Sequence, residues 1–234
     1  MANSRAHVSV VLAMSADGKI ADRDRTAARF SSANDLAYLE ALVAKADAVL
    51  FGADTLRAYG TCLSVRQPDL IAQRKSRQQP SQPMQIVCSQ SGKLDPQWRF
   101  FRQPVPRWLL TSRTGTQRWS EIAGDGSTNF DQILPDLEEP MDWRSLLQRF
   151  HQLGIQRLAL LGGGTVVASF AEQALIDELY LTICPLLLGG KTAPTPFDGV
   201  GLVLSQALKL RLVELRQVED EVFLHYRRCQ PPGD

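Results

Sequence analysis

Residues 157–173 read RLALLGGGTVVASFAEQ, and this stretch indicates the fold class. Residues 157–161 form a short apolar run that is typical of a buried strand, and residues 166–173 are expected to be helical. Three consecutive glycines, Gly162 to Gly164, lie between them. A strand that turns directly into a helix is the repeating unit of α/β proteins, so the stretch predicts a sheet covered by helices.

The same alternation continues on both sides of this stretch. Further strands are predicted at 7–14, 48–51, 84–88, 108–111 and 178–184, and further helices at 32–46 and 142–153. Ser32 and Asp35 have the spacing of a capping box at a helix start, with Asp in place of the usual Glu or Gln. Residues 208–212 and 222–226 alternate apolar and polar side chains, which predicts an antiparallel pair at the sheet edge. No repeat or low-complexity linker interrupts the pattern, so one domain over residues 1–234 is expected.

Composition excludes several classes of protein. The chain has 234 residues, of which 44% are hydrophobic and 22% charged, as in ordinary globular domains. A formal charge of +1 gives no basic field for nucleic acid or an anionic membrane. No apolar run approaches the ~20 residues of a membrane span, and the first residues do not resemble a signal peptide. Four widely separated cysteines favour reduced thiols in a cytoplasmic protein and argue against a metal site.

The glycine run has two interpretations. Glycines let the backbone approach a ligand closely, and the following helix offers free N–H groups and a positive dipole end to a phosphate. Alternatively, the run is a tight turn that only needs positive φ angles. It is not the Gly-x-Gly-x-x-Gly fingerprint, because Val166 breaks the spacing. Residues 189–192 (GGKT) end like a nucleoside-triphosphate loop, but Pro185 occupies the position of that motif's first glycine, which excludes it.

Four segments together resemble the pyrimidine reductases of riboflavin biosynthesis. They are 13–21 (AMSADGKIA), 48–56 (AVLFGADTL), the glycine run with 175–179 (LIDEL), and 189–199 (GGKTAPTPFDG). The resemblance implies a dihydrofolate-reductase-like, three-layer α/β fold. Its central sheet is mixed and mostly parallel, has flanking helices, and carries an antiparallel C-terminal edge. The resemblance also implies a homodimer, and a single reductase domain without the zinc deaminase domain of larger relatives.

The family's chemistry is the NADPH-dependent reduction of a ribosylaminopyrimidine 5′-phosphate to the ribitylamino compound. By matching position, the resemblance implies that the cofactor contacts Ala13, Gly52, Thr55, Gly162, Gly163, Gly164, Thr165 and Val166, with Ser89 on its adenosine side. Leu63 and Arg66 are the expected contacts of the phosphorylated substrate. Asp17 and Lys19, on the loop after the first strand, are the candidate catalytic residues. For Ser89 and for Asp17 a simple turn role is an equal alternative.

Four positions depart from the family pattern, and they concern the substrate more than the cofactor. Tyr59 replaces an Asp, Leu161 a Glu, Val43 an Arg and Val11 a Lys. A leucine can neither accept a hydrogen bond nor relay a proton. Three hypotheses therefore stay open: a pyrimidine reductase with altered substrate contacts, an NADPH-dependent reductase of another small substrate, and a catalytically weak NADPH-binding protein. A dihydrofolate reductase is disfavoured because no acidic residue is recognisable as the proton donor to a pterin.

Overall fold

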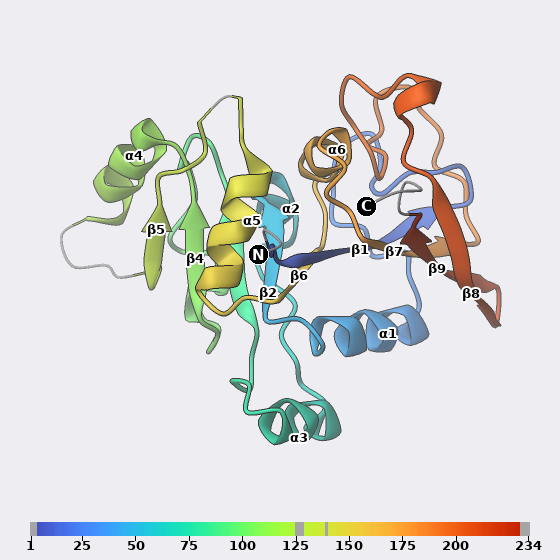
Figure 1. The fold of residues 1–234 in the computed structure, drawn as a ribbon, viewed down its shortest axis with the longest axis horizontal. Helices are drawn as coiled ribbons and strands as arrows, with labels where there is room; N and C mark the ends of the chain where they lie inside the picture. The colour runs from blue at the N-terminus through green and yellow to red at the C-terminus, as the bar shows by residue number, and fades with distance from the viewer. Residues whose placement is uncertain (1–3, 125–128, 139, 230–234) are drawn as a thin grey trace.

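The computed structural model describes residues 4–124, 129–138 and 140–229. Within these residues, nine strands form one sheet in the order β5-β4-β3-β2-β6-β1-β7-β9-β8. The strands are β1 (His7–Ser15), β2 (Ala48–Gly52), β3 (Met84–Cys88), β4 (Arg107–Leu110), β5 (Gln132–Leu134), β6 (Arg157–Leu160), β7 (Glu178–Cys184), β8 (Leu210–Val218) and β9 (Glu221–Arg228). Figure 1 shows β5 at one end of the sheet and β8 at the other.

The sheet is mixed and mostly parallel, as expected. All neighbours from β5 to β7 pair in parallel, whereas β9 is antiparallel to β7 and β8 is antiparallel to β9. The predicted antiparallel C-terminal edge is therefore confirmed. Its outer strand is longer than predicted and starts later, at Leu210, and its register shifts between Leu212 and Glu214. Such a bulge interrupts strict alternation, which hid the second half of the strand in the sequence.

The helices are α1 (Ala33–Val43), α2 (Ala53–Tyr59), α3 (Pro68–Ser76), α4 (Arg113–Ala123), α5 (Trp143–Gln152) and α6 (Gly164–Glu172), with two 3₁₀ turns, η1 (Arg99–Arg102) and η2 (Leu204–Gln206). The sequence predicted α1, α5 and α6 but not α2, α3, α4 or the short strand β5. The helix α2 has only seven residues and no side-chain cap, and α3 is largely polar. Neither gives a long amphipathic stripe, which is the signal that sequence reading depends on.

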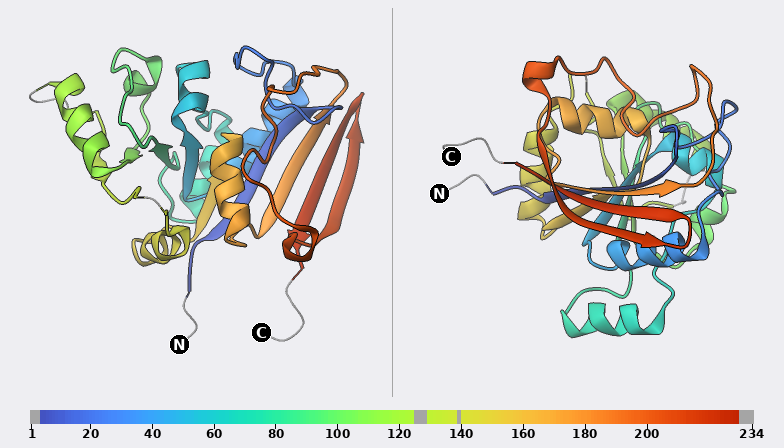
Figure 2. Two further views of the ribbon diagram at one scale, coloured as in Figure 1. Left: turned by 90° about the horizontal axis from the view of Figure 1, so that it is seen from above. Right: turned by 90° about the vertical axis from the view of Figure 1, so that its right-hand side faces the viewer.

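Helices cover both faces of the sheet, which gives three layers (Figures 1 and 2). On one face, α5 and α6 bury Leu147, Phe150 and Phe170 against strand residues such as Leu50. On the other face, α1, α2 and α4 contribute to a second cluster around Phe51. Adjacent residues of β2 thus point into different clusters, as the two-residue period of a strand requires.

The strand order brings distant parts of the chain together at one edge. The strand β6 lies between β1 and β2, although a long stretch of sequence separates it from both. Because these strands are parallel, the loops that follow Ser15, Gly52 and Leu160 emerge at the same edge. The carboxyl edge of an open parallel sheet, near a reversal of strand order, is where α/β proteins bind ligands. The glycine run follows β6 at this edge.

Candidate functional site

Two adjoining cavities lie at this edge. The first, the glycine-loop cavity, has a volume of about 800 Å³ and is lined by the segments that follow β2, β3, β4 and β6. The second, the apolar cavity, has a volume of about 360 Å³ and lies between β1, α1, α2 and the residues after β6. The two share the lining residues Ile20, Ala28, Thr55, Tyr59 and Gly163. The two cavities therefore border on each other at these residues.

The glycine turn has a backbone that other residues rarely adopt. Gly162 has φ +122° and Gly163 has φ +76°. The N–H of Gly52 donates to the carbonyl of Gly162 at 3.4 Å, so the turn packs directly on the start of α2. Gly163 caps α6 without a side chain, and the first-turn residues of that helix line the glycine-loop cavity. N–H groups in a first turn have no partner inside their helix and suit a phosphate.

Gly164 is needed for packing. A Cβ atom at Gly164 would lie 2.2 Å from the carbonyl oxygen of Thr195. The N–H of Asp198 donates to the carbonyl of Gly164 at 3.1 Å, and the carboxylate of Asp198 accepts from the N–H and hydroxyl of Thr195. The segment after β7 is therefore fixed against the start of α6, where it completes the wall of the cavity.

Hydroxyl groups line the opposite wall of the glycine-loop cavity. Ser89, Ser91, Ser112 and Thr114 come from the segments after β3 and β4. Ser89 is buried, and its carbonyl accepts from the hydroxyl of Thr111 at 2.6 Å. The hydroxyl of Ser112 caps α4 by accepting from the N–H of Gly115. This wall offers uncharged hydrogen-bonding groups, which suit a ribose or a heterocycle.

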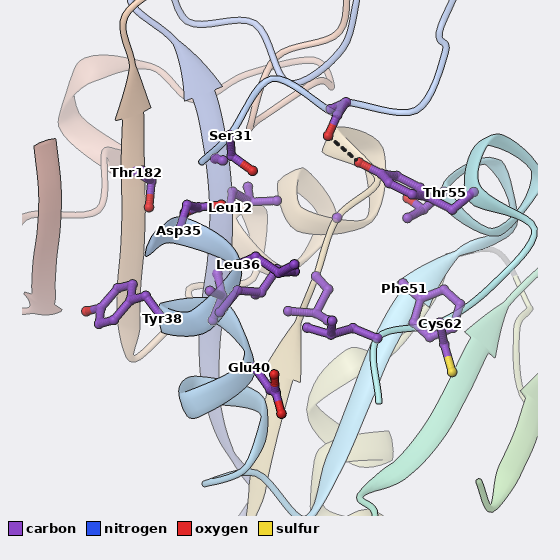
Figure 3. Close-up of a pocket in the computed structure, with 18 of the residues that line it drawn as sticks. Leu12, Ser31, Asp35, Leu36, Tyr38, Glu40, Phe51, Thr55, Cys62 and Thr182 are labelled. Atoms are coloured by element: carbon purple, nitrogen blue, oxygen red, sulfur yellow. Dashed lines mark hydrogen bonds between the residues drawn. The ribbon is translucent and has the colours of Figure 1, made fainter. Parts of the chain in front are cut away.

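The lining of the apolar cavity is mainly apolar, with a group of polar side chains at one side. Leu12, Leu36 and Leu161 line its walls. Figure 3 shows Ser31, Asp35 and Thr182 gathered at one side of it. Thr55, Phe51 and Cys62 lie at the opposite side.

Three of the four departures from the family pattern line this same cavity. They are Val11, Tyr59 and Leu161, whereas Val43 is fully buried in the second core cluster. The hydroxyl of Tyr59 donates to the carbonyl of Ala28 at 3.0 Å, which ties α2 to the loop after β1. Val11 and Leu161 line the apolar cavity alone, whereas Tyr59 lines both cavities.

Side chains from elsewhere in the chain hold the segment 60–66, which carries Leu63 and Arg66. The carboxylate of Glu40 accepts from the N–H groups of Arg66 and Gln67 at 2.5 and 2.7 Å. The amide of Gln103 accepts from the N–H of Cys62 and donates to its carbonyl. Both Leu63 and Arg66 line the apolar cavity, and the side chain of Arg66 extends into solvent at its rim. A phosphate at that rim would meet a guanidinium group of matching geometry.

The structure places most of the predicted residues along the two cavities. Gly52, Thr55, Ser89, Gly163, Gly164, Thr165 and Val166 line the glycine-loop cavity. Ala13, Leu63, Arg66 and Gly162 line the apolar cavity, and Thr55 and Gly163 belong to both. Residues that lie far apart in sequence, such as Ala13 and Gly162, thus meet at one site.

Asp17 and Lys19 line neither cavity. The carboxylate of Asp17 accepts from the hydroxyl of Ser15 at 2.6 Å and from the N–H groups of Leu188 and Gly189. These hydrogen bonds lower the pKa of Asp17 to about 2. The ammonium of Lys19 donates to the carbonyl of Ala193 at 3.2 Å. Both side chains connect the loop after β1 to the segment after β7, so their catalytic role stays a prediction.

Asp35 is the residue of the site that sequence reasoning missed. It lies in the first turn of α1, is 5% exposed and lines the apolar cavity. Burial raises the pKa of its carboxyl group, although hydrogen bonds from Thr182 and Ser31 partly oppose that rise. The sequence alone assigned no acidic residue to this cavity, and the structure puts Asp35 there. The signal was Asp35 itself, which was interpreted only as half of a capping box.

The thiol of Cys62 and the spacing of possible metal ligands bear on two further kinds of chemistry. Burial raises the pKa of the Cys62 thiol in the apolar cavity to about 12, so this thiol stays protonated and is a poor nucleophile. Across the ranges that the structure describes, no three His, Cys, Asp or Glu side chains are grouped to hold a metal ion.

In the same ranges no helix is long and apolar enough to span a membrane. The four cysteines form no disulfide.

Comparison with known proteins assigns the family. The RibD C-terminal domain matches residues 6–224. A 2,5-diamino-6-ribosylamino-4(3H)-pyrimidinone 5′-phosphate reductase of Archaeoglobus fulgidus is 29% identical over 83% of this chain and 87% of its own length. Among solved structures, a pyrimidine reductase-like protein from Corynebacterium diphtheriae has a TM-score of 0.80 at 18% identity, over 97% of this chain and 93% of its own.

A larger protein shares the same fold over part of its length. It is a diaminohydroxyphosphoribosylaminopyrimidine deaminase/5-amino-6-(5-phosphoribosylamino)uracil reductase from Thermotoga maritima, with a TM-score of 0.74 and 19% identity. The similarity covers 96% of this chain and 57% of that protein. These neighbours confirm the expected dihydrofolate-reductase-like fold. Since the family match spans nearly the whole sequence, the chain belongs to the RibD C-terminal domain family.

Proposed function

We propose that this chain is an NADPH-dependent reductase of a ribosylaminopyrimidine 5′-phosphate in riboflavin biosynthesis. The observation that carries the proposal is the shared wall of the two cavities at Thr55 and Gly163. Hydride transfer needs donor and acceptor in direct contact and correctly oriented. Two unequal cavities that meet at one wall supply that arrangement for a large cofactor and a smaller substrate. The names of the relatives, including the Archaeoglobus reductase, give the proposed substrate.

The residues of the glycine-loop cavity fit a dinucleotide. The turn at Gly163 and the first turn of α6 would hold the pyrophosphate, with Gly162 on the side of the apolar cavity. Ser89 and the neighbouring hydroxyls would contact the adenosine half, while Thr55 and Ala13 would lie beside the nicotinamide. When bound, the cofactor supplies a hydride to C1′ of the opened sugar. The protein's part is to orient the two molecules and to keep water away from the reacting atoms.

The apolar cavity would hold the substrate. Leu12, Leu36 and Leu161 would contact the flat faces of a pyrimidine and exclude water from the shared wall. Arg66, at the rim, would bind the 5′-phosphate, and Glu40 keeps its backbone in place. Leu63 lies on the same segment and would contact the sugar.

We also propose that two copies of the chain associate through the edge strand β8. Its apolar side chains are exposed, with Leu212 at 47% and Leu215 at 60%. A long exposed edge strand with apolar side chains is normally covered, because it otherwise pairs with other chains. The four cysteines without a disulfide support a cytoplasmic location for this dimer.

One observation favours a second candidate, a reductase of the same fold with another small substrate. The cavity positions where the family has Lys, Asp and Glu hold Val11, Tyr59 and Leu161. With these charges absent, the cavity would accept a less polar molecule. A catalytically weak NADPH-binding protein is the third possibility that the same loss of charge leaves open.

A titration with NADPH and NADH, followed by thermal shift, tests the cofactor part first. Saturable binding stabilises a protein by RT ln(1 + [L]/Kd), about 2.7 kcal/mol at a hundredfold excess over Kd. We expect a response to NADPH that exceeds the response to NADH. Loss of NADPH absorbance on addition of the ribosylaminopyrimidine phosphate then tests the reaction. Binding of NADPH without turnover would favour the second or third candidate, and no binding of either nucleotide would refute all three.

A further inference from the structure

A third cavity lies toward the amino ends of the parallel strands, away from the glycine turn. It has a volume of about 600 Å³, within the range of small-molecule sites. Its floor is the face of the sheet on which α1 lies, since Tyr38 of α1 packs against Tyr180 and the floor residues alternate along β6, β1, β7 and β9. We call it the amino-edge cavity, and its lining includes Lys45, Arg157, Glu178, Tyr180, His225 and Arg227.

The lining holds two cations without an ion-pair partner. Lys45 and Arg157 are exposed, and neither forms an ion pair with another described residue. Among the described lining residues only Glu178 is acidic. Its carboxylate already accepts from the guanidinium of Arg227 at 3.0 Å and from the hydroxyl of Tyr180 at 3.1 Å. An anionic ligand would therefore meet two unpaired positive charges here.

Asp47 joins the two segments that carry these cations. Its N–H donates to the carbonyl of Arg157 at 2.9 Å, so the segment after α1 runs beside the start of β6. Its carboxylate accepts from the N–H groups of Gln156 and Arg157 at 2.9 Å and from the side-chain amide of Gln79 at 2.6 Å. These oxygens are thereby used on backbone and amide donors. Lys45 lies two residues before Asp47, and both cationic side chains line the same cavity.

The floor of the amino-edge cavity offers aromatic and apolar surface. The rings of Tyr180 and His225 stack with their centroids 4.2 Å apart and their planes at 12°. Val11 and Ala159 add apolar surface from β1 and β6. Nε2 of His225 is buried and makes no hydrogen bond within the described residues, although the Glu178 carboxylate lies 3.4 Å away. A flat heteroaromatic ring would bury apolar area here and offer this nitrogen a partner.

We propose that the amino-edge cavity is a second small-molecule site and that it binds a mononucleotide. Lys45 and Arg157 would bind the phosphate, since ammonium and guanidinium groups form strong charge-assisted hydrogen bonds with it. The base would lie against Tyr180 and His225. Val11 and Tyr180 also line the apolar cavity, so the two sites are neighbours. The proposal goes beyond the proposed reductase function and does not depend on it.

Protection of Lys45 from acetylation tests the site in the wild-type protein. Acetylation by an N-hydroxysuccinimide ester is followed by peptide mass spectrometry, with adenosine 5′-monophosphate as the probe and NADPH present to fill the glycine-loop cavity. At a tenfold excess of the probe over its Kd we expect acetylation of Lys45 to slow about tenfold, because the bound nucleotide covers the ammonium group. Lys75 of α3 is exposed and lines none of these cavities, so its acetylation should not change.

This measurement separates the proposal from the reductase function. Lys45 lines neither the glycine-loop cavity nor the apolar cavity, so its protection reports on the amino-edge cavity even if NADPH does not bind. Acetylation of Lys45 at the same rate with and without the nucleotide would overturn the proposal. Equal protection by inorganic phosphate or by adenosine would also overturn it, because one half of the nucleotide would then make no contact. Slower acetylation at raised protein concentration, without nucleotide, would show that a second copy covers the cavity instead.

Removal of the two charges tests the phosphate contacts. The double variant Lys45→Gln and Arg157→Gln should bind adenosine 5′-monophosphate about tenfold more weakly or worse, measured by isothermal titration calorimetry, because it loses charge-assisted hydrogen bonds. The control double variant, Lys75→Gln and Arg144→Gln, removes the same charges from exposed positions on α3 and α5 and should bind like the wild type. Equal weakening in both variants would indicate general attraction between charges and contradict a defined site. The acetylation result does not require either variant to fold.

Discussion

The backbone of Gly163 gives the first prediction, at the scale of a residue. A Cβ atom here would lie 3.7 Å from the Cα atom of Gly52, which is an ordinary van der Waals distance, so a side chain would meet no steric clash at its Cβ atom. Gly163→Asp would bring a carboxylate to the start of α6, where a phosphate is proposed to bind. We expect NADPH affinity to fall about 100-fold, which is about 2.7 kcal/mol. Isothermal titration calorimetry measures it.

Gly154→Asp is the control for this substitution. Gly154 also has a positive φ, +89°, but a Cβ atom there meets nothing within 4 Å, and Gly154 lines neither cavity. Both variants add the same charge at a glycine with a positive φ. Equal NADPH affinity in the two variants and the wild type would mean that the glycine run is only a turn.

Asp35 leads to a prediction about stability and pH. Burial raises its pKa above the ordinary value of about 3.9, and Glu221 of β9 adds to the rise. Asp35 also interacts with Cys184 of β7 and Tyr59 of α2. A raised pKa means that the folded chain binds the proton more tightly than the unfolded chain. The stability that this proton gives is full below about pH 4 and is lost as the pH rises through the folded pKa.

Asparagine does not titrate and so avoids this loss. We therefore expect Asp35→Asn to melt a few degrees above the wild type at pH 8, since 1 kcal/mol moves Tm by about 2–4 °C in a chain of this length. The difference should shrink toward pH 4. Thermal unfolding followed by circular dichroism across this range decides it. A lower Tm for the variant at pH 8 would show that the ionised carboxylate stabilises the fold, contrary to the prediction.

The same residue shows what a sequence can reveal about a site. The glycine run and Thr55 follow strands directly, so their place at the sheet edge could be predicted from local pattern. Asp35 could not, because its freedom depends on Glu221, which lies far along the chain and takes over the N–H of Ser32. The capping-box spacing predicted that Asp35 would accept from the N–H of Ser32. In the structure Glu221 accepts from it instead.

At the scale of elements, a buried arginine joins α3 to the end of α1. The guanidinium of Arg74 is 1% exposed and donates to the carbonyls of Ala44, Ala46 and Pro80 at 2.6 to 3.0 Å. Arg74→Met would leave these carbonyls without a donor. We expect a loss of about 2–4 kcal/mol in the free energy of unfolding, measured by urea denaturation.

Arg77→Met is the comparison for Arg74→Met. Arg77 ends the same helix but is exposed, and its side chain makes one long hydrogen bond, to Gln73 at 3.4 Å. This change should cost less than about 0.5 kcal/mol. If both substitutions lower the free energy of unfolding by the same amount, the prediction is wrong and the three carbonyls have other donors. The largely polar sequence of α3 did not reveal the helix, which the buried Arg74 and the partly buried Leu70 and Ile71 attach to the rest of the protein.

At the scale of the whole molecule, alternation of strands and helices was sufficient to predict the class of fold and most of the strands. It did not predict the order of the strands, because β6 inserts between β1 and β2 through contacts between distant segments. Two cavities share a wall only because of that insertion, which brings Gly163 beside Gly52 and Thr55. The strand order therefore creates the site. The resemblance to a family predicted which residues would meet there, whereas local sequence pattern could not.

The outer edge of the sheet leads to the last prediction. The strand β8 has one neighbour, β9, and exposes Leu210, Leu212, Val213 and Leu215. We expect sedimentation velocity to give twice the chain mass of 26.0 kDa for the wild type. Two like charges on this edge, in the double variant Leu212→Lys and Leu215→Lys, would face their copies across a two-fold axis and dissociate the dimer. Leu187→Lys, at a residue that is 77% exposed and lies outside β8, should leave the mass unchanged. A monomeric wild type, or a double variant that remains dimeric, would show that β8 is not the interface.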